Sequence, residues 1–159
     1  MTTSARSRRL VVAVSISLAL GGAAAGVANT TTARRSAGAF AVRVKQIEVA
    51  KQWGRLWSLL HPGQRAFIPR SLFVRCLSRR RVVGPKPKSI RAVATSTVLE
   101  RIPGVTKRRV PIKAVKLKII YASAPSQLLT TKIASVHGSW YWITNAGSRK
   151  AFVRIYFCS

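Results

Sequence analysis

The chain has 159 residues, of which 29 are Lys or Arg and only 2 are Asp or Glu, so its formal net charge is +27 at pH 7. Glu48 and Glu100 are the two acidic residues, and there is no Asp. This composition excludes most enzyme mechanisms that depend on carboxylates, and it makes an anionic partner or surface the first one to consider. Apolar residues make up 48% of the chain, which is enough for a packed core despite the charge.

The N-terminus has the pattern of a cleavable export signal. Basic residues at positions 6–9 precede an apolar run from Leu10 to Leu20, and small residues follow as far as Ala28. The apolar run is shorter than the roughly 20 residues that a membrane span needs. Its two adjacent arginines resemble a twin-arginine signal, with a general secretion signal as the alternative. We expect cleavage after Ala28 and a flexible spacer over residues 29–39.

Residues 40–159 are enough for one domain with a single core. From Phe40 to Leu60, apolar residues recur at helical spacing and predict an amphipathic helix, which His61-Pro62-Gly63 would end. A second helix is predicted from Pro69 to Leu77, where Pro suits the first turn and the apolar residues share a face. The first half of the domain is therefore predicted to be helical.

After residues 79–88 the periodicity changes from helical to alternating. In the segment from Val110 to Tyr121, apolar residues alternate with Lys116 and Lys118, as in a half-buried antiparallel strand. Turn residues separate the predicted strands, which are Ile90–Ile102, Val110–Tyr121, Leu128–His137, Trp140–Thr144 and Ala151–Cys158. Helices packed on one face of a curved antiparallel sheet would form an α+β domain.

Cys76 and Cys158 are the two cysteines. An exported chain meets an oxidising compartment, in which a pair of thiols is usually joined, so we expect one disulfide. On the chain-entropy model it would contribute roughly 4 to 5 kcal/mol. The two histidines, His61 and His137, are scattered and do not have metal-ligand spacing, so we expect neither a metal site nor a cofactor.

Two segments carry a family resemblance: Trp53–Pro62, with its Leu-Leu-His-Pro end, and Val136–Trp142, with Gly-x-Trp-x-Trp. Together with Arg70–Cys76 between them, they resemble the nuclear transport factor 2-like superfamily, which includes SnoaL-like and ketosteroid isomerase-like proteins. The resemblance covers about residues 40–145 and is closest to small exported bacterial members of unknown function. It implies a cone, with helices embraced by a strongly bent sheet and a pocket at the open end, and a possible homodimer through the sheet.

Enzymes of this superfamily generally place a carboxylate base inside the cone. Glu100 is a catalytic candidate, and the alternative is a rim carboxylate paired with Lys or Arg. His61 is another candidate, with a helix-end role as its alternative. Aromatic residues at helical or alternating spacing fit either a core or a pocket wall; the candidates for a ligand pocket are Trp53, Trp57, Phe73, Trp140 and Trp142.

The basic residues form clusters, and the candidate anion-binding residues are Arg79, Arg80, Arg81, Lys113, Lys116 and Lys118. Alternation places Lys116 and Lys118 on one solvated face, where they repel each other unless an anion lies over them. An anionic wall polymer or an acidic lipid surface fits such a face, whereas nucleic acid is expected to bind only non-specifically, because aromatic residues for base readout are lacking. Compositional bias is the alternative explanation of the charge.

We therefore expect an exported, non-enzymatic binding domain of unknown ligand. It would associate with anionic cell-surface polymers through a basic face. The alternative is a SnoaL-like isomerase or hydrolase with a small apolar substrate in the cone.

Overall fold

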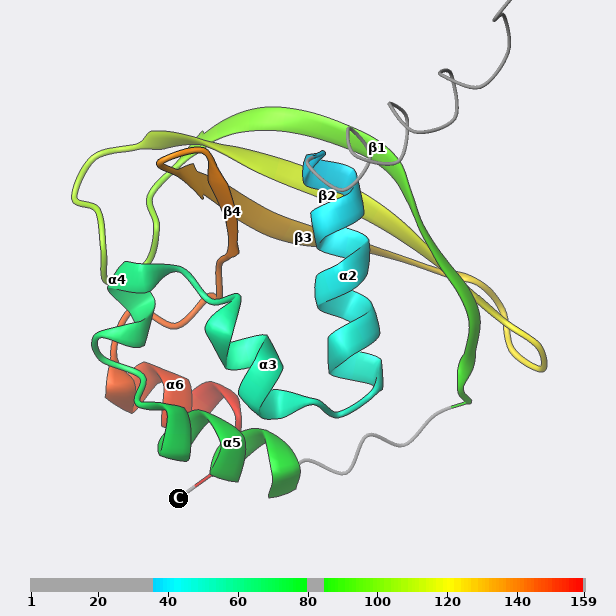
Figure 1. Cartoon of the computed structure of the whole chain (residues 1–159), viewed down its shortest axis with the longest axis horizontal. Helices are drawn as coiled ribbons and strands as arrows, with labels where there is room; N and C mark the ends of the chain where they lie inside the picture. Colours follow the sequence, from blue (N-terminus) through cyan, green and yellow to red (C-terminus); the bar gives the residue numbers. More distant parts are fainter. Residues whose placement is uncertain (1–35, 80–84, 159) are drawn as a thin grey trace, which may run out of the picture.

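The computed structural model describes residues 36–79 and 85–158, so the expected export signal, most of the expected spacer, and Arg80 and Arg81 lie outside the described residues. The described part has an α+β fold, as predicted, with helices on one side of a four-stranded antiparallel sheet (Figure 1). The helices are α2 (Ala37–Val49), α3 (Trp53–Ser58), α4 (Pro62–Arg65), α5 (Arg70–Arg79) and α6 (Arg149–Ile155). The strands, in their order across the sheet, are β1 (Pro87–Glu100), β2 (Val110–Tyr121), β3 (Gln127–Val136) and β4 (Ser139–Trp142).

The two faces of the sheet follow from the alternation of β2. Val115, Leu117 and Ile119 are buried and face the helices, whereas Lys116 is exposed on the opposite side. Helix α2 lies across the first face and contacts β1, β2 and β3 (Figure 1). The main core lies between this face and the helices, with Phe73 of α5 and Phe152 of α6 fully buried in it.

A smaller core lies on the other side of the sheet, at one end. Ile102 and Ile112 are buried there together with Ala134 and Ile143, because the loop between β1 and β2 folds back over the strands. Hence only part of this second side is covered. We call the remainder the outer face: Arg91, Ala94 and Ser96 of β1, Lys116 and Lys118 of β2, and Leu128 and Thr130 of β3.

The single helix predicted from Phe40 to Leu60 is wrong, because α2 ends at Val49 and α3 begins at Trp53. Lys51 has a φ of 55°. Its N–H donates to the Glu48 carbonyl, and the Gln52 N–H donates to the Ile47 carbonyl, which together form a Schellman motif. A glycine usually occupies the left-handed position of this motif, so Lys51 gave no sequence signal of a helix end. Helix α2 also includes residues 37–39, which were expected to belong to the spacer.

The predicted fifth strand, Ala151–Cys158, is also wrong, because these residues lie in and just after helix α6. The Ser148 side chain accepts a hydrogen bond from the Ala151 N–H and caps the helix. The Phe152 ring stacks on Phe73 with a centroid distance of 5.5 Å and contacts Tyr156 one turn later at 4.6 Å. Packing of one apolar helix face thus overrides the strand propensity of Phe, Val, Ile and Tyr.

The expected disulfide is present and joins Cys76 of α5 to Cys158, just beyond α6, with the two Cα atoms 4.9 Å apart. Both cysteines are buried in the main core. The bridge therefore ties the last described residues to the helical layer. Across residues 36–79 and 85–158, no helix combines the length and the apolar composition that a membrane crossing requires.

Candidate functional site

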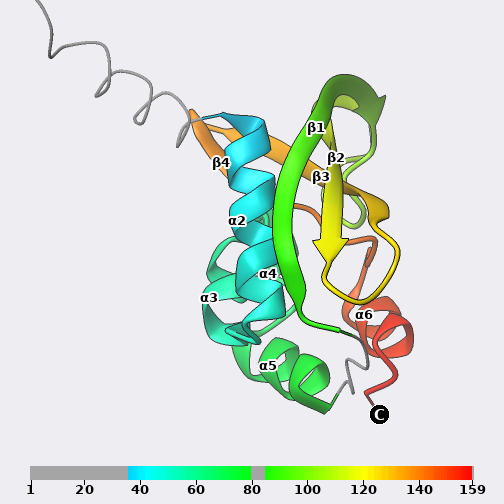
Figure 2. The same ribbon diagram turned by 90° about the vertical axis from the view of Figure 1, so that its right-hand side faces the viewer.

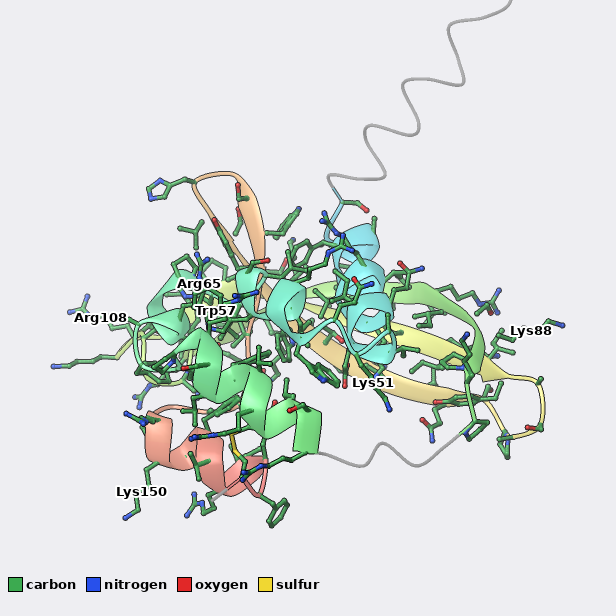
Figure 3. All side chains as sticks on the ribbon, turned by 60° about the horizontal axis from the view of Figure 1, so that its bottom comes forward. Lys51, Trp57, Arg65, Lys88, Arg108 and Lys150 are labelled. Carbon is green, nitrogen blue, oxygen red and sulfur yellow. A yellow bond between two sulfur atoms is a disulfide. The ribbon has the colours of Figure 1, made fainter. Side chains whose placement is uncertain are left out.

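Cations surround the molecule, so total charge alone does not define a site. Figure 3 labels Lys51, Lys88, Arg108 and Lys150, which extend from different sides of the domain. Both glutamates are already engaged: Glu48 with Lys45, at 3.0 Å, and Glu100 with Lys132. A candidate site must therefore be a place where the fold holds several cations close together.

The outer face is such a place. Arg91 of β1 lies directly opposite Lys118 of β2, and Lys116 lies opposite Ala94, two residues along β2 from Lys118. Facing residues of antiparallel strands have Cβ atoms about 5 Å apart, and residues two apart on a strand are about 7 Å apart. The three positive charges are thus placed on one solvated surface, where they repel one another.

The other candidate anion-binding residues are not brought to this surface. Lys113 lies at an odd-numbered position of β2, opposite Ile133 of the helix-covered face, and its Nζ donates a 2.6 Å hydrogen bond to Thr97 Oγ1. Arg79 ends α5 on the helical side, and Arg80 and Arg81 lie outside the described residues. The structure instead adds Arg91 to the cations of this surface. The bounds of the predicted strand did not reveal that Arg91 lies opposite Lys118, because they do not give the register between the two strands.

Glu100 lies on β1, and its carboxylate accepts a hydrogen bond from Lys132 on the side of the sheet that faces away from the helices. It borders an open depression of about 580 Å³, lined by Leu99, Glu100, Arg101 and Arg109. A carboxylate held by a lysine on an open surface does not have the geometry of a buried general base. The charged rim role predicted as the alternative fits this placement.

His61 caps the start of α4: its Nδ1 accepts a 3.1 Å hydrogen bond from the Gly63 N–H. Burial and, second, the nearby Arg65 cation lower the pKa of His61 below its ordinary value. Nδ1 must be unprotonated to accept from Gly63, so the bond itself also favours the neutral ring. His61 thus lies at a helix end, but at the start of α4 and not at the end of the predicted helix Phe40–Leu60.

Arg65 lies between two aromatic rings. Its guanidinium carbon is 5.5 Å from the centroid of Trp57 and 5.9 Å from that of Tyr141, and Figure 3 shows Arg65 beside Trp57. The Tyr141 ring also meets His61 edge-on, with centroids 6.2 Å apart. Sequence reasoning did not pair Arg65 with these rings, because the contact joins α3, α4 and β4.

The candidate pocket aromatics are mainly packed against their neighbours. Phe73 is fully buried, Trp53 is buried, and Trp142 meets Phe73 edge-on at 6.3 Å. Trp57 Nε1 donates a 2.8 Å hydrogen bond to the Ile68 carbonyl, and Trp140 is partly buried against the main core. These contacts are those of core residues, and the depression beside Glu100 lies away from them.

Gln64 is a buried polar residue that the sequence did not single out. Its Nε2 lies within 3.2 Å of the carbonyl oxygens of Pro103, Thr144 and Ala146, and its Oε1 accepts a 2.9 Å bond from the Thr144 N–H. One side chain thus joins α4 to two loops that are far apart in the sequence. Gln is ordinarily exposed, so its residue type gave no signal of this role.

The described part of the chain defines an α+β protein whose helices cover one face of a four-stranded antiparallel sheet. Scans of the chain against protein-family models, curated proteins and solved structures gave no match. Among residues 36–79 and 85–158, no group of three or more His, Cys, Asp or Glu is placed to hold a metal ion.

Proposed function

We propose that the chain is an exported, non-enzymatic binding domain that associates with an anionic cell-surface polymer through the outer face of its sheet. The observation that carries this proposal is the register that places Arg91 opposite Lys118, with Lys116 beside them. A polymer of regularly spaced negative charges would relieve the repulsion among these cations and would release its counterions. The nearest carboxylate, Glu100, is already bound to Lys132 and so leaves the three cations uncompensated.

Membership of the nuclear transport factor 2-like superfamily remains part of the proposal. Its support is the placement of the helices on one face of the sheet and the arch of β1 around α2 (Figure 1). The disulfide supports export, because structural disulfides persist in oxidising compartments. The enzymatic alternative lacks such support, since Glu100 is held by Lys132 and His61 is held by Gly63.

A polymer explains the outer face better than a second copy of the chain does. A homodimer through this face would bring two sets of Arg91, Lys116 and Lys118 together, at a Coulomb cost that only bound anions could offset. Acidic lipid surfaces and nucleic acids present the same negative charge. Retention on each of them is therefore measured for comparison in the test.

The test is retention of the purified protein on isolated bacterial cell walls, eluted with increasing NaCl. The double variant Lys116→Gln/Lys118→Gln is compared with Lys51→Gln/Lys150→Gln, which removes the same charge from exposed positions elsewhere. We expect the outer-face variant to elute at a clearly lower salt concentration than the control. Equal elution of both variants, or equal retention on acidic vesicles and on DNA cellulose, would reject specific association with the wall polymer.

A further inference from the structure

Strand β1 is a long edge strand that the described residues leave open. It is the terminal strand of the sheet, spans 14 residues and, among residues 36–79 and 85–158, pairs only with β2. All seven side chains from Arg91 to Thr97 are exposed, and Val93 and Leu99 are exposed apolar residues at 47% and 63%. Figure 2 shows β1 running along the front of the domain, with α2 beside it.

An edge strand presents a row of backbone N–H and C=O groups that can pair with another extended chain. Proteins usually block such edges with bulges, prolines or lysines. In β1 these devices are confined to the first half, which contains Pro87, Lys88 and register shifts between Pro87 and Ser89 and between Ala92 and Ala94. From Ala94 to Glu100 the register with β2 is regular, and this stretch contains no Pro, Lys or Arg.

The surrounding charges select the kind of chain that could pair there. Lys86, Lys88 and Arg91 lie at one end of β1 and Arg101 lies just past the other, while Lys118 lies opposite Arg91 on the neighbouring strand. A strand added to β1 would lie about 4.8 Å away, so its side chains would be within reach of these cations. A second copy of this basic chain would be repelled, whereas acidic side chains would be attracted.

We propose that the free edge of β1 binds an extended, acidic peptide segment of another protein, which adds to the sheet as a fifth strand beside β1. Backbone hydrogen bonds along Ala94–Glu100 would provide the affinity, and acidic side chains near Arg91 and Lys88 would provide the selectivity. This surface differs from the outer face, because it would recognise an extended polypeptide backbone through hydrogen bonds and not a row of negative charges.

The test uses the full chain and a synthetic peptide of about twelve residues with alternating Val and Glu. In an added strand, alternate N–H groups point toward β1 and the others point to solvent. A second peptide carries N-methyl groups on alternate residues and keeps one edge that can donate hydrogen bonds, and a third carries them on every residue and keeps none. The peptides share charge and amino-acid sequence, so they differ in whether a donor edge is left to pair with β1.

We expect the fully methylated peptide to bind at least about tenfold more weakly than the peptide methylated on alternate residues, as measured by titration calorimetry. Amide signals of Ala94–Glu100 should shift in NMR spectra when the better peptide is added. Equal affinities of the two methylated peptides would mean that charge alone holds the peptide and would overturn the proposal. Absence of shifts at these amides when the better peptide is added would also overturn it, because the peptide would then bind elsewhere.

Discussion

The helix-covered face of the sheet and its outer face are built from the same strands, yet they hold different kinds of side chain. On β2, Val115 and Leu117 enter the main core, while Lys116 and Lys118 alternate with them on the other side. The covered face is joined to its helices by aromatic packing, and a disulfide ties the last described residues to α5. Within residues 36–79 and 85–158, no such layer covers the outer-face residues Arg91, Ala94 and Ser96, which are exposed. Stability should therefore depend on the first face, and binding on the second.

The largest change in stability is expected when the disulfide on the helical side is removed. Cys76→Ala/Cys158→Ala should lower the free energy of unfolding by roughly 4 to 5 kcal/mol, because the bridge joins residues 82 apart in the sequence. Urea unfolding measures the change. A reducing agent should destabilise the natural chain by a similar amount and leave the double variant unchanged; a loss smaller than about 2 kcal/mol would show that packing alone holds α6.

The next largest effect is expected at Gln64, where two loops that are far apart in the sequence meet. Gln64→Leu leaves buried carbonyls of Pro103, Thr144 and Ala146 without their shared donor, so we expect a loss of about 3 kcal/mol. Gln46→Leu, at an exposed position of α2, is the matched control and should change stability by less than about 0.5 kcal/mol. Similar losses in both variants would contradict the role given to Gln64.

A smaller change, and a gain in stability, is expected for substitution of Lys51, which lies on the surface of the helical side. Its φ of 55° favours glycine, so Lys51→Gly should stabilise the protein by about 0.5 to 1 kcal/mol. The thermal midpoint in calorimetry measures this gain. Ala50→Gly, at a position with a φ of −74°, should instead destabilise, and a loss in both variants would mean that Lys51 is not strained.

The smallest effect on stability at neutral pH is expected for substitution of His61. This effect becomes larger as the pH falls. Because the pKa of His61 is lowered by burial and by Arg65, the unfolded chain binds more protons than the folded one below about pH 6.5. Stability should therefore fall as the pH decreases from neutral toward the lowered pKa. His61→Gln should flatten this dependence, whereas His137→Gln, in an exposed turn, should leave it in place.

The fold class and the position of β2 could be predicted from the sequence because alternation reports which face is buried. Val110–Tyr121 was predicted with the bounds that the structure gives. The wrong long helix and the wrong fifth strand have local causes that composition does not reveal. Lys51 ends a helix in a position that glycine usually occupies, and residues 151–158 have strand propensity but pack as a helix on Phe73.

The lysine pair of the candidate site could be predicted as well. The shared face of Lys116 and Lys118 follows from spacing on one strand. The position of Arg91 does not, because it depends on the register of β1 and on the bulge between Ala92 and Ala94. Gln64 and Arg65 were missed for a related reason: their partners come from loops and strands distant in the sequence.

The contacts of Gln64 have a consequence for hydrogen exchange. The Thr144 N–H donates to Gln64 Oε1 and the Ala146 N–H donates to Thr144 Oγ1, both in buried surroundings. Near them, the backbones of Gly104 and Gly147 approach so closely that a Cβ on Gly104 would lie 2.2 Å from the Gly147 oxygen. These loop amides should therefore exchange as slowly as the core, while amides on the free edge of β1 exchange quickly, which reverses the usual order of loops and strands.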